Sequence, residues 1–193
     1  MNEPLSPLVL QPLDTLQDLR LPQRPSARFM LAHPAHAIAL GFGSGLSPKA
    51  PGTVGTLWAW LAFLMLQPWM SDTRWAWLIA ASLPLGWWAC TVTARDMGVA
   101  DPGSIVWDEV AAFWLVLWLV TPVGWVDQWL AFGLFRFFDA VKPGPVAWAD
   151  QLFHDQARSG TAGGWRLAGL GIMLDDLVAA GCTLLVMALW RIA

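Results

Sequence analysis

The chain has 193 residues, of which 56% are hydrophobic and 13% are charged, and its mean hydropathy is +0.50. Soluble domains carry about 25% charged residues, so the composition argues against a soluble domain and favours several membrane-spanning helices. The net charge of −3 and the lack of a basic stripe argue against nucleic-acid binding. Fifteen tryptophans without a tyrosine suit a membrane–water interface.

Residues 1–30 are interpreted as a mobile or interfacial cytoplasmic tail, followed by one helical membrane domain over residues 31–193. The tail has early acids and several prolines, and it lacks the short apolar core and small-residue cleavage site of a signal peptide. His33 and His36 of "HPAH" are interpreted as interfacial residues, because no third metal ligand accompanies them.

The stretch "GFGSGLSPKAPGTVGT" is too rich in glycine and proline to cross a membrane. It lacks the GK[ST] ending of a nucleotide-binding loop. Free backbone N–H groups ahead of a helix start can nevertheless hold phosphate. The polar side chains of this loop, Ser44, Lys49 and Thr53, are therefore candidate phosphate contacts.

Five hydrophobic runs follow the loop, near residues 53–70, 75–94, 104–120, 126–138 and 171–190. The fourth run is short for a bilayer, which needs about 20 residues, so we expect four to five spans. The sequence shows no alternating pattern typical of strands and no internal repeat. The sequence thus predicts an all-α, multi-span transmembrane bundle with polar loops.

Alternation of the spans across the membrane places nearly all acids and all Gly/Pro-rich loops on one face. That face also carries nine of the eleven basic residues, while Arg74 and Arg191 lie on the other. Cytoplasmic loops carry an excess of lysine and arginine. We therefore expect a multi-pass protein of the cytoplasmic membrane with its polar site facing the cytoplasm.

Two adjacent acidic pairs, Asp108–Glu109 and Asp175–Asp176, lie at the ends of apolar runs on this face. A charge at membrane depth costs about 3 kcal/mol or more, whereas converging carboxylates suit Mg²⁺, which prefers oxygen ligands. Single acids at helix starts can simply offset the helix dipole, but two pairs on one face favour a site. The candidate metal ligands are Asp96, Asp101, Asp108, Glu109, Asp139, Asp175 and Asp176.

Three cations near these acids, Arg95, Arg136 and Lys142, are candidates for binding phosphate oxygens. Arg136 and Asp139 share a helix face at i, i+3 spacing, which also allows a simple intrahelical ion pair. The acids expected to take part in catalysis are Asp108, Glu109, Asp139, Asp175 and Asp176.

The two cysteines, Cys90 and Cys182, lie in apolar runs and are expected to be structural. Arg95 follows Cys90, but four residues separate them, whereas a phosphate-loop thiol nucleophile needs five and a run of free N–H groups.

Four blocks together resemble the phosphatidylglycerophosphatase A family of bacterial membrane phosphatases. They are "GFGSGLSPKAPGTVGT", "TARDMGVADPGSIVWDE", "FRFFDAVKPGPVAWAD" and "GIMLDDLVAAG", in the order and at roughly the spacing of the family. The resemblance implies an all-α helical bundle in the bacterial inner membrane. It also implies Mg²⁺-dependent hydrolysis of the terminal phosphomonoester of phosphatidylglycerophosphate, giving phosphatidylglycerol and inorganic phosphate. It adds Asp150 to the acidic motif positions.

This chain departs from the family pattern in two places. The segment before "GIM" is longer than usual, and Trp148 and Gln151 stand where relatives commonly have arginine. An alternative from another class is a transporter or channel with an acidic cytoplasmic vestibule, although such proteins usually show mid-span charges and inverted repeats. A CDP-alcohol phosphotransferase is a closer chemical rival, but its spaced aspartate signature is missing. Nothing in the sequence indicates an oligomeric state.

Overall fold

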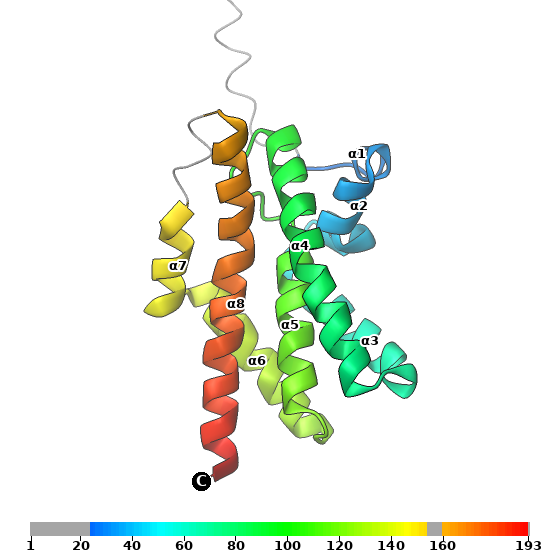
Figure 1. Ribbon diagram of the computed structural model, residues 1–193, viewed down its shortest axis with the longest axis vertical. Helices are drawn as coiled ribbons and strands as arrows, with labels where there is room; N and C mark the ends of the chain where they lie inside the picture. Colours follow the sequence, from blue (N-terminus) through cyan, green and yellow to red (C-terminus); the bar gives the residue numbers. More distant parts are fainter. Residues whose placement is uncertain (1–23, 154–159, 193) are drawn as a thin grey trace, which may run out of the picture.

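The structure is a computed structural model that describes residues 24–153 and 160–192, and within these ranges it contains helices and no strands (Figure 1). This confirms the all-α prediction. In chain order the elements are α1 (Ala27–Ala32), α2 (Pro34–Ala39), the 3₁₀ segment η2 (Gly41–Leu46), α3 (Pro51–Leu66), the 3₁₀ turn η3 (Gln67–Trp69), α4 (Asp72–Met97), α5 (Trp107–Val120), α6 (Trp125–Val141), α7 (Pro145–Phe153) and α8 (Ala162–Ile192).

Helix α5 forms the centre of the bundle and packs against α3, α4 and α8. It is apolar on all sides after its first turn, and a helix of this kind is typically buried among other helices or in a membrane. Its tryptophans also satisfy their polar atoms: Trp114 donates to the Ala59 carbonyl at 2.9 Å, and Trp107 donates to the Ser82 carbonyl at 3.1 Å. Helices α6 and α7 pack on α8, opposite to α1 and α2, which lie beside α4 (Figure 1).

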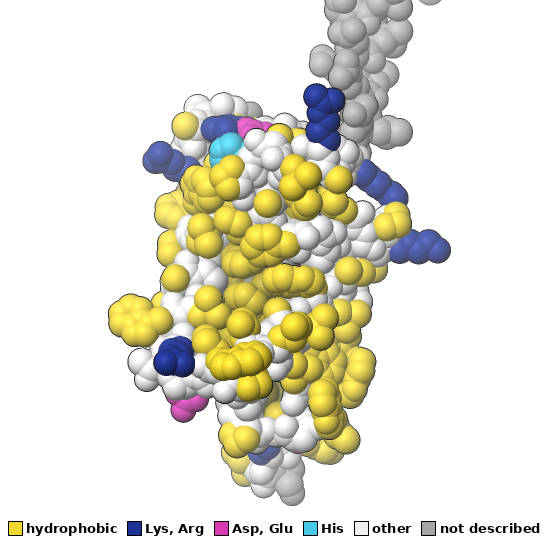
Figure 2. All heavy atoms as spheres, turned by 90° about the vertical axis from the view of Figure 1, so that its right-hand side faces the viewer, with side chains coloured by type: hydrophobic (Ala, Val, Ile, Leu, Met, Phe, Trp, Pro, Cys, Tyr) yellow, Lys and Arg dark blue, Asp and Glu magenta, His cyan; other side chains and the backbone are white. Residues whose placement is uncertain are grey.

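Two helices among the described residues are long and apolar enough to cross a membrane, α4 with 26 residues and α8 with 31. Helices α3, α5 and α6 have 16, 14 and 17 residues and are shorter than the usual span. Figure 2 shows hydrophobic side chains covering the middle of the face that carries α1 to α4, with lysine and arginine side chains gathered toward the upper end. This distribution supports a membrane protein.

The helix boundaries differ from the predicted ones in the segment before "GIM", which we expected to be a loop as far as residue 170. Helix α8 already begins at Ala162, because the Thr161 hydroxyl accepts a hydrogen bond from the Gly164 N–H at 3.1 Å and caps the helix start. Gly163 and Gly164 of this segment therefore lie in the first turn of a helix. Helix α7 likewise occupies a segment that was predicted to be a loop, and Pro145 is its first residue, as the restricted φ of proline permits.

The N-terminal boundary predicted between residues 30 and 31 falls inside α1. Residues 1–23 of the predicted tail lie outside the described residues, as do His154 and Asp155 of the loop before α8.

Candidate active site

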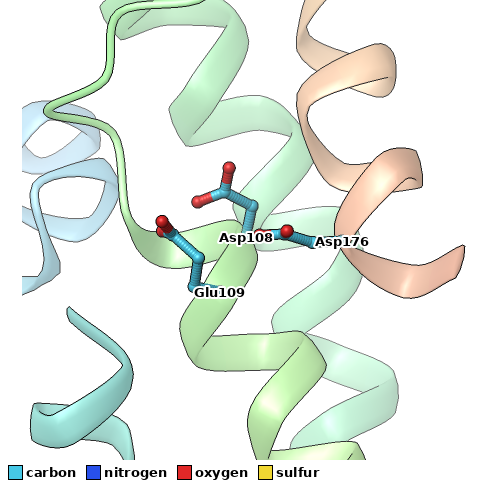
Figure 3. A group of neighbouring side chains, drawn as sticks. All are labelled: Asp108, Glu109 and Asp176. Atoms are coloured by element: carbon cyan, nitrogen blue, oxygen red, sulfur yellow. The ribbon is translucent and has the colours of Figure 1, made fainter. Parts of the chain in front are cut away.

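Three carboxylates meet where α5 begins beside the middle of α8 (Figure 3). Asp108 and Glu109 come from the first turn of α5, and Asp176 comes from α8. One carboxylate oxygen from each lies within 4.8 Å of the others, although the three residues are only 8%, 8% and 3% exposed. Ionised carboxylates buried this close repel one another, and a bound cation would relieve this repulsion.

Two oxygens of this acidic cluster have no hydrogen-bond partner within the described part of the chain. They are Asp108 Oδ1 and Glu109 Oε2, and both are buried. A buried acceptor left without a partner costs about 1–3 kcal/mol, and more when it is charged. Oxygen donors of this kind are what a hard divalent cation binds. The residues present therefore fit the Mg²⁺ that the sequence predicts.

Arg136 of α6 supplies positive charge beside the acidic cluster. Its guanidinium donates to the Asp139 carboxylate, lies 3.6 Å from Glu109 Oε1 and donates to the Thr56 hydroxyl of α3 at 3.3 Å. The i, i+3 pair expected between Arg136 and Asp139 is therefore present, and the same arginine also reaches two other helices. It links the end of α6 to the beginnings of α3 and α5.

Gly52, in the first turn of α3, allows these side chains to come so close to the helix. A Cβ atom at this position would lie 2.2 Å from Glu109 Oε1 and 3.2 Å from both terminal nitrogens of Arg136. The Thr56 hydroxyl donates to the Gly52 carbonyl at 2.9 Å, which leaves its oxygen free to accept from Arg136. The first turn of α3 thus forms one wall of the site.

Lys142 connects the helices on the side of the site that lies away from α3. It ends α6 in the left-handed conformation (φ 49°), and its ammonium group donates to Asp150 of α7 and, at 2.6 Å, to Asp175 of α8. Burial lowers the pKa of Lys142, but these two hydrogen bonds outweigh burial and raise the pKa above its ordinary value. Lys142 is therefore charged at neutral pH and joins three helices.

The two adjacent acids of α8 differ in their contacts. Asp175 Oδ2 accepts from Lys142, and its Oδ1 accepts from the Asp176 N–H at 3.1 Å. Both oxygens of Asp175 thus already have protein partners, whereas Asp176 faces Asp108 and Glu109. Asp175 also lines a small pocket with Asp101 and Asp150, next to the acidic cluster.

Other predicted site residues lie away from the acidic cluster. Asp96 lies 3.0 Å from His36 Nε2 and forms an ion pair with the exposed Arg95 at 2.8 Å. His36 is only 5% exposed and is therefore buried inside the protein. Ser44 donates to the Gly41 carbonyl at 2.9 Å.

Lys49 is exposed ahead of α3, and Thr53 is half-buried in its first turn. The sequence reasoning missed Gly52, Thr56 and His36 as neighbours of predicted site residues. The predicted helix start at "APGT" was the only feature of the sequence that pointed to Gly52 and Thr56. Cys90 is fully buried, as expected of a structural cysteine, and Cys182 is partly buried.

A helical bundle with membrane-length helices, a buried carboxylate cluster and flanking cations is suited to a divalent metal and a phosphorylated membrane lipid. The chain belongs to the phosphatidylglycerophosphatase A family, whose sequence pattern matches residues 37–191. The family resemblance drawn from the four sequence blocks is thereby confirmed.

Curated relatives agree with this assignment. The chain is 39% identical over 155 residues to the phosphatidylglycerophosphatase A of Escherichia coli, covering 79% of this chain and 81% of the relative. It is 38% identical over 158 residues to the enzyme of the same name from Haemophilus influenzae, covering 81% and 88%. A protein named putative phosphatidylinositol-3-phosphatase from Bacteroides thetaiotaomicron is 35% identical, covering 80% and 91%. No solved structure matches the chain.

Proposed function

We propose that this chain is a phosphatidylglycerophosphatase, which hydrolyses the terminal phosphomonoester of phosphatidylglycerophosphate to phosphatidylglycerol and inorganic phosphate. The observation that carries the proposal is the buried Asp108–Glu109–Asp176 cluster, two of whose oxygens have no partner among the described residues, in a chain of the phosphatidylglycerophosphatase A family. The transporter alternative has no support from the relatives, whose names are those of phosphatases.

Mg²⁺ is the proposed cofactor, and Asp108, Glu109 and Asp176 are the residues that would hold it. When bound, such an ion polarises phosphoryl oxygens and lowers the pKa of a bound water. The proposal rests on the chemistry of the donor set. It consists of three carboxylates and no nitrogen or sulfur ligand, and two of the carboxylates have a buried oxygen without a partner in the described part of the chain.

Arg136 is the proposed phosphate-binding residue of the chain. A planar guanidinium can hold two phosphate oxygens at once, and Asp139 fixes its orientation by accepting its hydrogen bond. The beginning of α3 lies directly against it, and the free N–H groups of a helix start also favour an anion. A phosphomonoester placed there would lie next to the acidic cluster.

Lys142 and Asp175 are assigned a positioning role. Their ion pair fixes the backbone of α8 at the residue before Asp176, and Asp150 extends the same contact to α7. These groups hold Asp176 in place, so that the acidic cluster does not relax apart when its charges repel one another.

The protein is further proposed to cross the bacterial inner membrane several times, with the site at the cytoplasmic surface. The supporting observations are the membrane-length helices α4 and α8 and the excess of basic residues on the face that carries the acids. The charged residues at the opposite end are few, among them Arg74 and Arg191, which donate to backbone carbonyls.

The test is phosphate release by the purified protein in detergent micelles with Mg²⁺, for three lipids offered separately. We expect phosphatidylglycerophosphate to be hydrolysed at least tenfold faster than phosphatidylinositol 3-phosphate or phosphatidic acid. Faster turnover of phosphatidylinositol 3-phosphate would assign this chain the activity that the Bacteroides relative is named for. No release from any of the three lipids would contradict a phosphatase.

A further inference from the structure

We propose that the protein thins the bilayer around its shorter helices, so that the acidic cluster, only about 20 Å from the opposite end of the bundle, lies level with the cytoplasmic headgroups. The partner that the apolar surface of the bundle fits is a bilayer whose hydrocarbon layer is thinner than the usual depth of about 30 Å. The thinning rests on the proposed crossing of the membrane and adds to it the depth at which the site lies.

The helices around the acidic cluster are short between the cluster and the far end of the bundle, where α3, α5 and α8 end and α4 and α6 begin. A Cβ at Gly52 of α3 would lie 2.2 Å from Glu109 Oε1, and one at Gly86 of α4 would lie 2.5 Å from Trp107 Cδ1, so both glycines are level with the first turn of α5. From this level to the far end, the helices measure about 17 to 24 Å at 1.5 Å per residue. The segments are residues 52–66, 72–86, 108–120, 125–136 and 176–192. Any tilt of a helix reduces the height that it spans.

The far end of the bundle carries charged groups that mark a membrane surface. Asp72 and Arg74 are exposed in the first turn of α4. Arg191 at the end of α8 donates to the Val120 carbonyl at the end of α5, so these two helices end at the same level. Charged side chains are strongly disfavoured in hydrocarbon. The hydrocarbon layer therefore begins at the far end, and it reaches the acidic cluster well before about 30 Å have been crossed.

An exposed cation marks the other boundary close to the level of the acidic cluster. Lys49 lies just ahead of α3 and forms no ion pair within residues 24–153 and 160–192. Exposed apolar side chains follow along α3, among them Leu57, Leu61 and Met65, which are 41%, 58% and 64% exposed. Figure 2 shows this kind of apolar area between cations gathered toward the upper end and a few charged side chains lower down. A bilayer of ordinary thickness that began at the far end would cover residue 49 with hydrocarbon, whereas a thinned one leaves it at the surface.

Exposed tryptophans lie in two groups whose separation fits the same thin layer. The group near the far end consists of Trp69, Trp77, Trp125, Trp129 and Trp190, which are between 57% and 73% exposed. On α4 the second group is formed by Trp87 and Trp88, which are 40% and 42% exposed. Tryptophan prefers the headgroup level at both surfaces of a membrane. Along α4, however, Trp77 and Trp87 are only about 15 Å apart.

The two helices of membrane length do not require a thick hydrocarbon layer. Both continue beyond the first turn of α5 on the side of the acidic cluster (Figure 1). The continuing part of α4 carries the exposed Arg95, and that of α8 carries the exposed Arg166. These parts of α4 and α8 are therefore suited to the water and headgroup region above the cluster.

Thinning brings a lipid phosphate to the acidic cluster while its acyl chains stay in the bilayer. In an undistorted cytoplasmic leaflet, the phosphate would lie roughly 10 Å above the cluster. A bilayer accommodates short hydrophobic segments by thinning locally, at a modest cost for each ångström of mismatch. Thinning thus removes the need to pull the lipid out of its leaflet or to draw its charged headgroup into hydrocarbon.

The first test is the depth of spin labels on the full chain in vesicles of dioleoylphosphatidylcholine. Labels are attached to Lys49→Cys, at the proposed surface, and to the matched control Leu61→Cys, on the exposed side of α3 further down. Cys182 is replaced by serine, and Cys90 stays because it is fully buried. We expect the label at residue 49 to collide with a water-soluble nickel complex at least fivefold more often than the label at residue 61. The label at residue 61 should instead collide mainly with oxygen, which concentrates in hydrocarbon.

The second test is phosphate release from phosphatidylglycerophosphate by the unlabelled parent in vesicles of 14:1, 18:1 and 22:1 phosphatidylcholine. Longer chains give a thicker bilayer with a greater mismatch to the bundle. We expect the rate in 22:1 vesicles to be at least threefold lower than in 14:1 vesicles. The matched control is the same samples dissolved in detergent, where the three rates should be equal.

Two outcomes would overturn the proposal. A label at residue 49 that collides mainly with oxygen, as the label at residue 61 does, would show that the cluster lies below an undistorted membrane surface. Vesicle rates that do not change with chain length would show that the bundle has no preference for a thin bilayer. Because the label depths need no turnover, a lack of phosphate release in detergent would contradict the proposed phosphatase, and the label depths would still decide the thinning.

Discussion

Replacing Gly52 by alanine should strongly reduce turnover while leaving the fold almost unchanged. The new Cβ would lie 2.2 Å from Glu109 Oε1, so this oxygen must retreat by about 1 Å to reach the 3.4 Å of ordinary contact. The obstructing atom is the tip of a flexible side chain, and alanine has the better helix propensity by up to about 1 kcal/mol. We therefore expect the free energy of unfolding to change by no more than about 1 kcal/mol.

The effect on rate should be far larger than the effect on stability. A displacement of about 1 Å at a reacting centre can reduce the rate by about 10²-fold, which corresponds to roughly 2.7 kcal/mol of barrier. Glu109 is one of the three acidic cluster residues, and the guanidinium of Arg136, 3.2 Å from the new atom, must also give way. Both the proposed metal ligand and the proposed phosphate contact are displaced together.

The assay is phosphate release from phosphatidylglycerophosphate in mixed micelles, normalised to folded protein, alongside thermal unfolding of the same samples. Gly133→Ala is the matched control, because it lies on α6 with Arg136 and its new Cβ would meet no described atom within 4 Å. It should keep activity within twofold of the parent. If a well-folded Gly52→Ala variant also stayed within twofold, the wall assigned to α3 would not be part of the site.

Five other substitutions test individual residues of the site and the fold. Asp108→Asn should lower turnover by about 10² or more without preventing folding, whereas Asp72→Asn, an exposed residue at the other end of α4, should stay within a few-fold in the same assay. Gly55→Ala should cost about 1–3 kcal/mol in thermal unfolding, because its Cβ would lie 2.7 Å from a buried valine side chain. Lys142→Met should also destabilise by about 1–3 kcal/mol, since two carboxylates lose their partner. Cys90→Ser should retain most activity per folded molecule, and a folded but inactive variant would revive a thiol nucleophile.

The sequence predicted four of the helices, and its candidate acids include the three carboxylates that the structure brings together. Apolar runs bounded by Gly/Pro-rich segments located α3 to α6 to within a few residues, because burial in a bundle or a membrane demands such runs. A charged side chain at membrane depth costs free energy, so the position of Asp108 and Glu109 beside an apolar run was a sound reason to expect a functional site there. The glycines near the start of α8 misled the prediction, because a threonine cap permits a helix to begin among them.

Contacts between distant segments could not be read from the sequence. Adjacent residues of a helix point about 100° apart, and the sequence does not say that Asp176 turns toward α5 while Asp175 turns toward Lys142. His36 and Asp96 are 60 positions apart in the sequence, and no pattern in either segment predicts that they are in contact. The same holds for Gly52, whose importance arises from the side chain of another helix that occupies the place of its missing Cβ.

The most direct test of the account is phosphate release from phosphatidylglycerophosphate by protein stripped with EDTA, before and after Mg²⁺ is added, for the parent and Asp176→Asn. If the acidic cluster is a metal-dependent active site, the stripped parent should be inactive and should recover with Mg²⁺. Asp176→Asn should remain at least 10²-fold below the parent at the same Mg²⁺ concentration. Full turnover in EDTA, or a well-folded Asp176→Asn variant as active as the parent, would contradict the account.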